Sequence, residues 1–289
     1  DPRYPEVRNY LIHIYVNALK TWKVDGFKLD FIDDFKVYPE TDLSKANGRD
    51  YASVNQAVER LLRDVYESLQ AIQPNILIEF RQKYIGPALR SFGNMFRAFD
   101  CPNDSLTNRI RTTDVKLLCG QTAVHSDMFT WHYDEPVELA ALQVVNILFS
   151  VPQISVRLGE VSEECLQMLH FYTHYWRSHR EILLDGEFQA YRPSSNYPLL
   201  KSKNGQKIIY GIYDETIVEL DNNCAQLDLI NGKRSQQIVL QVGQSLGKCQ
   251  LKVYNCCGQE QSDQWIDLNS GLHVLDVPAA GLCQIQSQD

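Results

Sequence analysis

The sequence predicts an α/β fold in two parts, a parallel sheet built from strand–helix units and a smaller antiparallel β-sandwich after it. Before Asp185 and Gly186, short apolar runs alternate with long amphipathic stretches, which is typical of βα units. After Gly186 only short β-type runs follow, and Asn204-Gly205 and Asn231-Gly232 are dipeptides that favour hairpin turns. The 289 residues fit a prior of about 150 residues per domain. We therefore expect two domains, residues 1–185 and 186–289.

The helices of the first part are predicted by apolar side chains at helical spacing. Between Tyr51 and Ile72 the apolar residues fall on one face, and Pro74 stops the pattern because proline breaks a helix interior. The other helical stretches are residues 11–20, 105–118, 136–149 and 163–184.

The strands between these helices are short. Residues 75–80 (NILIEF) form an apolar run of the kind that is buried in a parallel sheet. The other strands of this part are predicted at 24–32, 95–100, 122–125 and 153–158. The strands of the sandwich are predicted at 208–213, 216–220, 238–242, 249–254, 273–277 and 282–285.

Composition and charge exclude several classes of protein. With 44% hydrophobic and 22% charged residues, the chain has globular composition. Its net charge of −8 argues against a surface that neutralises nucleic acid or anionic lipid. The longest apolar runs, such as residues 139–151, are too short to span a bilayer. We expect neither a nucleic-acid partner nor a membrane partner.

The eight cysteines form no C-x-x-C pair and no spacing typical of metal ligands. A chain of this length does not need disulfides for stability. The simplest interpretation is a set of free, buried thiols, and the cysteines leave the cellular compartment undecided.

Charged side chains gather where the predicted strands end. Lys28 and Asp30 point to the same side of their strand, and a lysine beside a carboxylate keeps it ionised, as a nucleophile requires. Later strands end in Glu79-Phe80-Arg81, in Asp100 with Asp104 just beyond, and in His125-Ser126-Asp127. Successive carboxylates suit glycoside hydrolysis, in which one attacks and another supplies a proton. Acidic residues also cap helices, and Asp104 could be such a cap before Ser105.

At these residues the sequence resembles the α-galactosidase clan, glycoside hydrolase families 27 and 36. Residues 22–31 (WKVDGFKLDF) look like the family's "G-x-D-x-x-K-x-D" strand, whose final Asp is the nucleophile. Residues 97–105 (RAFDCPNDS) are similar to the segment that holds the general acid/base. Residues 125–129 (HSDMF) resemble the "D-P-D-M-L" strand end, and residues 140–158 resemble the last helix and strand. The resemblance covers residues 1–185 in order.

The resemblance implies that residues 1–185 are about strands 4–8 of a (β/α)8 TIM barrel, and it implies a retaining α-galactosidase. Asp30 would attack the anomeric carbon, and Asp100 would protonate the departing oxygen. Lys28, Arg81 and Asp127 would orient sugar hydroxyls and tune the two carboxylates. Trp131 could stack on a sugar face. No metal or organic cofactor is needed, and glycan degradation somewhat favours a secreted or periplasmic location.

Two departures from the clan's motifs leave alternatives open. Three residues separate Asp100 from Asp104, where the clan has two, so Asp104 remains the alternative acid/base although Asp100 lies at the strand end. The glycine-rich signature of family 36 is absent, and Arg81-Gln82-Lys83-Tyr84 stand in its place. The substituent accepted at the sugar's 2-position is therefore open, so N-acetylgalactosamine or another α-linked sugar is an alternative to galactose.

The resembling segment starts just before the fourth strand of the barrel. Five strands cannot close an eight-stranded barrel, and an open edge exposes unpaired backbone groups. We therefore expect a C-terminal part of a longer enzyme, completed by the missing N-terminal half, by a partner chain or by a homo-oligomer. By itself the chain would hydrolyse poorly, because positioning residues are missing. An alternative of another class is a non-catalytic carbohydrate-binding chain.

Overall fold

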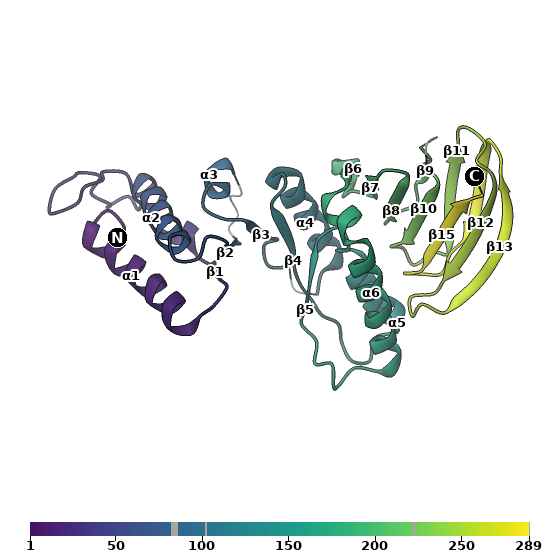
Figure 1. The fold of residues 1–289 in the computed structure, drawn as a ribbon, viewed down its shortest axis with the longest axis horizontal. Coiled ribbons are helices and arrows are strands. Elements are labelled where there is room, and N and C mark those ends of the chain that lie inside the picture. Colours follow the sequence, from purple (N-terminus) through teal and green to yellow (C-terminus); the bar gives the residue numbers. More distant parts are fainter. Residues whose placement is uncertain (82–85, 102, 222–223, 289) are drawn as a thin grey trace. The chain divides into compact units, whose positions relative to one another are not determined.

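The computed structural model describes the chain except residues 82–85, 102, 222–223 and 289 and the side chain at position 33. The chain divides into two compact units. Unit 1 contains residues 1–99 and 115–125, and unit 2 contains residues 100–114 and 126–289. Figure 1 shows the order of their elements along the chain.

Unit 1 is built on a parallel sheet with the strand order β1-β2-β3-β4. The strands are β1 (Gly26–Leu29), β2 (Leu77–Phe80), β3 (Met95–Arg97) and the first residues of β4 (Ala123–Phe129). The helices are α1 (Pro5–Trp22), the 3-10 turn η1 (Ile32–Asp34), α2 (Val54–Gln70), the four-residue α3 (Pro87–Arg90) and the second part of α4 (Ser105–Cys119). The predicted alternation of strands and helices is present in this unit.

The sequence pattern explains why the two faces of this sheet differ. Helix α2 begins at a capping residue, Ser53, whose hydroxyl accepts a hydrogen bond from the Gln56 amide. Its apolar face shares a core with Ile78, Phe80 and Phe96 of the neighbouring strands. Because side chains alternate along a strand, the residues between these apolar ones point to the other face of the sheet. The charged residues of the strands therefore share the face that the helices leave uncovered.

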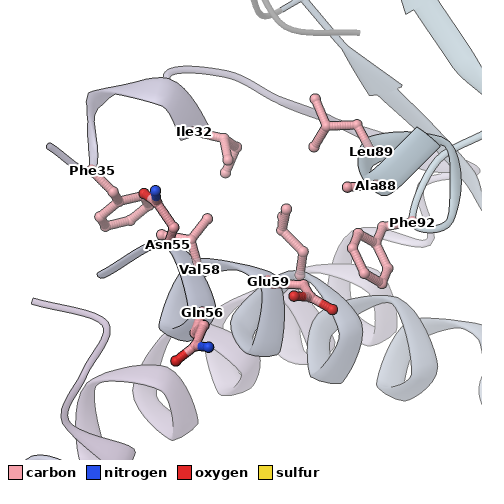
Figure 2. Close-up of a pocket in the computed structure, with 10 residues that line it drawn as sticks. Ile32, Phe35, Asn55, Gln56, Val58, Glu59, Ala88, Leu89 and Phe92 are labelled. Atoms are coloured by element: carbon pink, nitrogen blue, oxygen red, sulfur yellow. The ribbon is translucent and has the colours of Figure 1, made fainter. Parts of the chain in front are cut away.

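A cavity of about 520 Å³ adjoins the helix-covered side of unit 1 (Figure 2). It lies between η1, α2 and the segment that contains α3, and most of its lining is apolar. The lining residues are Ile32, Phe35, Asn55, Gln56, Val58, Glu59, Leu62, Ala88, Leu89 and Phe92. None of the residues predicted to act on substrate lines this cavity, so it is separate from the candidate site described below.

Unit 2 contains the end of β4, β5 (Val151–Ile154), α5 (Val137–Val145), α6 (Glu163–Asp185) and two further sheets. The seven-stranded sheet has the order β13-β12-β15-β10-β8-β7-β6, and the three-stranded sheet has the order β14-β11-β9. Their bounds are β6 Glu187–Tyr191, β7 Leu199–Asn204, β8 Lys207–Ile212, β9 Ile217–Glu219, β10 Gln226–Asn231, β11 Gln237–Val242, β12 Gly247–Tyr254, β13 Glu260–Leu268, β14 Gly271–Asp276 and β15 Leu282–Ser287. A buried apolar core contains residues of both sheets, as expected for a sandwich.

The sandwich differs from the prediction in three ways. The pairs β8–β10 and β9–β11 are parallel, because after β8 the chain crosses to the other sheet before it returns. Strands β6, β7, β10 and β13 were not predicted, and β13 is an exposed edge strand with few apolar residues to mark it. Asn204-Gly205 does form the β7–β8 hairpin turn, but Asn231-Gly232 does not form a hairpin, since β10 and β11 belong to different sheets.

The last helix joins the sandwich through a shared core. Helix α6 ends at Asp185 and β6 begins at Glu187. At this point the sequence pattern changes from alternating strands and helices to short β-type runs. Tyr175 on α6 donates a hydrogen bond to the buried Asp228 of β10 at 2.8 Å, and Tyr172 donates to the Ala280 carbonyl oxygen. Because α5 and α6 bury their apolar residues against this sheet, the compact unit extends across residue 185 (Figure 1). In the described part of the chain, no helix combines the length and apolar character that a membrane crossing requires.

Replacing Gly26 with Ala should destabilise unit 1. A Cβ atom at this position would collide with the Leu77 carbonyl oxygen, because β1 and β2 approach closely here. We expect the free energy of unfolding to fall by about 1–3 kcal/mol, the usual cost of overpacking. Urea denaturation followed by circular dichroism measures this change. Gly159→Ala is the matched control, since no atom lies within 4 Å of a Cβ atom there, and an equal effect of both substitutions would contradict the packing argument.

Candidate functional site

The uncovered face of the unit 1 sheet carries a row of charged side chains. Lys28 on β1 lies opposite Glu79 on β2 in the parallel register. Glu79 in turn pairs with His125 on β4, whose Nδ1 lies 2.5 Å from Glu79 Oε2. Both of these side chains are largely buried, and the pairing gives the Glu79 carboxylate a partner where contact with water is small.

Asp30 follows β1 directly and has one carboxylate oxygen fully engaged. Its Oδ1 accepts hydrogen bonds from Arg81 Nε at 2.8 Å and from the Phe31 amide at 2.9 Å, and Arg81 Nη2 also lies 2.8 Å away. Among the described residues no group donates to Oδ2. The arrangement therefore fixes the orientation of the carboxylate through one oxygen and leaves the second oxygen open.

The surroundings of Asp30 keep it ionised. Burial alone would raise the pKa of this carboxyl, but the hydrogen bonds from Arg81 and from the Phe31 amide outweigh it. The positive charges of Arg81 and Lys28 lower the pKa further, so the net shift is downward. Lys28 thus lowers the pKa of Asp30, as predicted, and Arg81 lowers it more.

Phe31 adopts an unusual backbone conformation next to this carboxylate. Its φ of 55° lies in the left-handed region, which is costly for a residue with a bulky side chain. Its ring is 63% exposed, and the Arg81 guanidinium lies over it at 5.1 Å and over the Phe99 ring at 5.5 Å. Arg81 therefore contacts the carboxylate and two aromatic rings, and a hydrophobic surface remains open beside Asp30.

In unit 2, Asp127 holds the loop that follows β3. Its buried carboxylate accepts hydrogen bonds from the Cys101 amide at 2.5 Å and from the Met128 amide at 2.8 Å. Asn108 of α4 exchanges two hydrogen bonds of 3.0 Å with the Asp127 backbone. The site role predicted for Asp127 was to orient sugar hydroxyls. The contacts of its carboxylate position the backbone next to Asp100, and the sugar-orienting role stays a prediction.

Asp100 and Asp104 occupy different environments in this loop. Asp100 is exposed, and its carbonyl oxygen accepts a hydrogen bond from Arg111. Asp104 caps α4, because Oδ1 accepts from the Thr107 amide at 2.9 Å and Oδ2 from the Thr107 hydroxyl at 2.5 Å. The hydrogen bonds from Thr107 lower the pKa of Asp104. The helix-cap alternative thus accounts for Asp104, and a carboxyl with a lowered pKa is a poor proton donor.

Trp131 lies in the core of unit 2. Its side chain is 6% exposed and stacks on Phe129, with ring centroids 6.1 Å apart. The expectation that Trp131 presents a face for sugar stacking does not fit this burial, since apolar residues of α5 and α6 share its core cluster. The exposed aromatic residue next to a candidate carboxylate is Phe31 instead.

The predicted site residues fall into two sets. Lys28, Asp30 and Arg81 lie together in unit 1, whereas Asp100, Asp104, Asp127 and Trp131 belong to unit 2. Gln82, Lys83 and Tyr84, the rest of the segment that replaces the glycine-rich signature, lie outside the described residues, as does Pro102.

Sequence reasoning left three groups without a role: the Glu79–His125 pair, Phe31 and Asn108. Strand ends had marked Glu79 and His125, but no sequence signal showed that their side chains meet. Among the described residues, no group of three or more His, Cys, Asp or Glu side chains is placed to hold a metal ion. All eight cysteines are free, and burial raises the pKa of the Cys101 thiol to about 12, so this thiol stays protonated at neutral pH.

No protein-family model and no curated protein sequence matches the chain. Solved structures do match it. The GH36 α-galactosidase AgaA from Geobacillus stearothermophilus superposes with a TM-score of 0.63 at 11% identity, covering 99% of this chain and 39% of that one. A GH27 β-L-arabinopyranosidase from the same organism gives 0.55 at 12% identity, covering 99% and 63%. An α-amylase from Geobacillus thermoleovorans, complexed with acarbose, gives 0.56 at 11% identity, covering 99% and 65%.

These similarities establish the fold. The chain matches the C-terminal part of a glycosidase barrel followed by a β-sandwich domain, as the sequence predicts. It spans between 39% and 65% of the length of the three enzymes. These neighbours are all glycoside hydrolases, and they include both families of the predicted clan as well as amylases.

Replacing Asp104 with Ala should affect stability through the lost helix cap. We expect the free energy of unfolding to fall by about 1 kcal/mol, the usual effect of removing an N-cap side chain. The thermal midpoint measured by calorimetry reports this loss. Asp134→Ala is the matched control, because the Asp134 side chain is 92% exposed. If Asp104→Ala matches this control in stability, the capping role is wrong.

Proposed function

We propose that this chain carries the catalytic carboxylates of a retaining glycoside hydrolase that releases terminal α-linked galactose. The observation that carries the proposal is the geometry of Asp30, an ionised carboxylate with one oxygen anchored and the other open at the end of a barrel strand. Catalytic side chains of TIM-barrel enzymes come from the carboxyl ends of the strands. The glycoside hydrolases among the structural neighbours support the reaction class.

In the proposed first step, Asp30 Oδ2 attacks the anomeric carbon. A glycosyl ester forms as the bond from the anomeric carbon to the leaving oxygen breaks. Arg81 and the Phe31 amide hold Oδ1, so the attacking oxygen is directed without any change in the rotamer of Asp30. Lys28 adds a positive charge that helps to keep Asp30 ionised, and it is exposed on its strand, where a sugar hydroxyl can reach it.

Asp100 is the proposed general acid/base. It would protonate the leaving oxygen in the first step and remove a proton from water in the second, which releases the sugar and regenerates Asp30. Asp100 is exposed, and Asp127 positions its backbone through the neighbouring Cys101 amide. Asp104 is the weaker candidate because its carboxylate is committed to the cap of α4.

The sugar is proposed from the motifs around Asp30 and Asp100. The structural neighbours include an α-galactosidase, a β-L-arabinopyranosidase and an α-amylase, so the shared fold is compatible with several sugars. N-Acetylgalactosamine and other α-linked sugars remain the alternatives of the same mechanism. Activity is tested on the protein that carries this chain in full, because the chain spans between 39% and 65% of the length of the compared enzymes.

Asp30→Ala should abolish turnover of aryl α-galactosides. The loss removes the nucleophile, so we expect the rate to fall by several orders of magnitude, and added azide should restore a glycosyl azide product. The measurement is release of the aryl group across a panel of α-galactoside, α-N-acetylgalactosaminide and α-glucoside substrates. Asp104→Ala is the matched control and should keep most of its activity. A near wild-type rate for Asp30→Ala would contradict the proposed mechanism. If Asp104→Ala is inactive and Asp100→Ala is active, Asp104 is the acid/base instead of Asp100.

Replacing Arg81 with Gln should move the acid limb of the pH profile to higher pH. Arg81 lowers the pKa of Asp30, so without it Asp30 becomes protonated at a higher pH and the ionised nucleophile is lost sooner as pH falls. By the same linkage, the stability that the ionised Asp30 contributes is present above its unfolded-state pKa and lost as pH falls through the folded value. The pH dependence of kcat/KM measures the shift, and Arg81→Lys should shift it less. A shift of the acid limb to lower pH would contradict the assignment.

A further inference from the structure

The seven-stranded sheet of unit 2 has a polar surface that the proposed reaction does not use. One face of its strands is buried in the core shared with the three-stranded sheet, through residues such as Leu227, Leu251 and Ile285. On the opposite face, the part nearest α6 is covered, because Ile209, Ile230 and Leu282 belong to the core cluster of that helix. The rest of this opposite face carries polar side chains.

These polar side chains form a row across five neighbouring strands. The register pairs Lys207 with Gln226, Gln226 with Gln286, Gln286 with Gln250, and Gln250 with Trp265. We call Lys207, Gln226, Gln286, Gln250 and Trp265 the glutamine strip. Its residues lie on the neighbouring strands β8, β10, β15, β12 and β13, which are labelled in Figure 1. With about 4.8 Å between strands, the strip is roughly 19 Å long.

Lys207 in the strip and Lys252 beside its glutamines are each already paired with an acidic residue of the sheet. Lys207 Nζ lies 3.1 Å from the buried Asp228, and Lys252 Nζ lies 3.3 Å from Asp263. A phosphate or a carboxylate ligand would therefore compete with an existing ion pair at either lysine. The glutamine part of the strip is therefore suited to a ligand without net charge.

The amides of the strip are available to such a ligand. Among the described residues, none forms a hydrogen bond with the side-chain amide of Gln226 or Gln286, and Gln250 uses its N–H to bind Asp263 at 2.8 Å. A carboxamide has both a donor and an acceptor, which matches a sugar hydroxyl. A cavity of about 120 Å³ lies over this surface, lined by three strip glutamines, Lys207 and their neighbours.

Trp265 ends the strip with an exposed aromatic ring. The side chain is 51% exposed on the edge strand β13, and Lys248 Nζ lies 5.5 Å from the ring centroid. An aromatic side chain with an apolar face and a polar end is suited to stack on the apolar face of a sugar ring. An exposed tryptophan beside a row of open amides combines the two kinds of contact that a neutral glycan needs.

We propose that the glutamine strip is a second carbohydrate-binding surface, which holds a neutral oligosaccharide or polysaccharide chain. The substrate class rests on the proposed glycosidase function, whereas the strip itself lies in the sandwich and contains none of the proposed catalytic residues. It would keep the enzyme on a polymeric glycan between cleavage events. Trp265 stacks on one sugar, and the amides bind hydroxyls along the chain.

Affinity electrophoresis of the full protein tests the strip. Native gels would contain guar galactomannan, soluble starch or, as the charged polymer, polygalacturonate. We expect at least one neutral polysaccharide to retard the protein, and Trp265→Ala and the double variant Gln226→Ala, Gln286→Ala to weaken this binding by tenfold or more. Trp22→Ala is the matched control, because Trp22 is 73% exposed and lies in unit 1, and it should bind like the wild type.

The outcomes separate this proposal from the proposed function. Asp30→Ala should bind the polysaccharide as tightly as the wild type. A loss of activity in this variant, with binding retained, is therefore a result about the catalytic proposal alone. No retardation by either neutral polymer, retardation by polygalacturonate alone, or unchanged binding by Trp265→Ala would overturn the strip. Capture of a protein instead of a glycan by the same residues would also overturn it. Thermal midpoints equal to that of the wild type show that the variants are folded.

Discussion

The pairing of β1 with β2 is the constraint on which the candidate site depends. Parallel register places the end of one strand beside the end of the next, so Asp30 and Arg81, 51 positions apart in the chain, meet at 2.8 Å. The close approach of the two backbones at Gly26 and Leu77 is part of the same pairing. Without this register, Asp30 would lose its main partner and the orientation of its carboxylate.

The two units use carboxylates in different ways. In unit 1, Asp30 accepts hydrogen bonds through Oδ1, and among the described residues no group donates to Oδ2. In unit 2, Asp127 and Asp104 use both oxygens for backbone or local side-chain donors, which is an arrangement for structure. The hydrogen bonds of these carboxylates therefore distinguish residues that their positions near strand ends do not.

The sandwich also provides two different surfaces on one sheet. Its seven-stranded sheet is covered by α5 and α6 over part of one face, through tyrosine hydrogen bonds and a shared apolar core. The remaining part of that face is polar, and its ion pairs are internal. This division gives one sheet two surfaces, one that holds the barrel's last helices and one that is open to a ligand.

Much of this protein could be predicted from its sequence, because strand–helix alternation and side-chain period are local properties. The helix at 54–70, the position of Asp30 after a strand, its side shared with Lys28 and the cap role of Asp104 all follow from residues near one another in the chain. Only the tertiary structure decided which distant residues meet. The Glu79–His125 pair, the burial of Trp131 and the alignment of glutamines from three separate strands depend on strand order and register. These are set by long-range packing that no local pattern encodes.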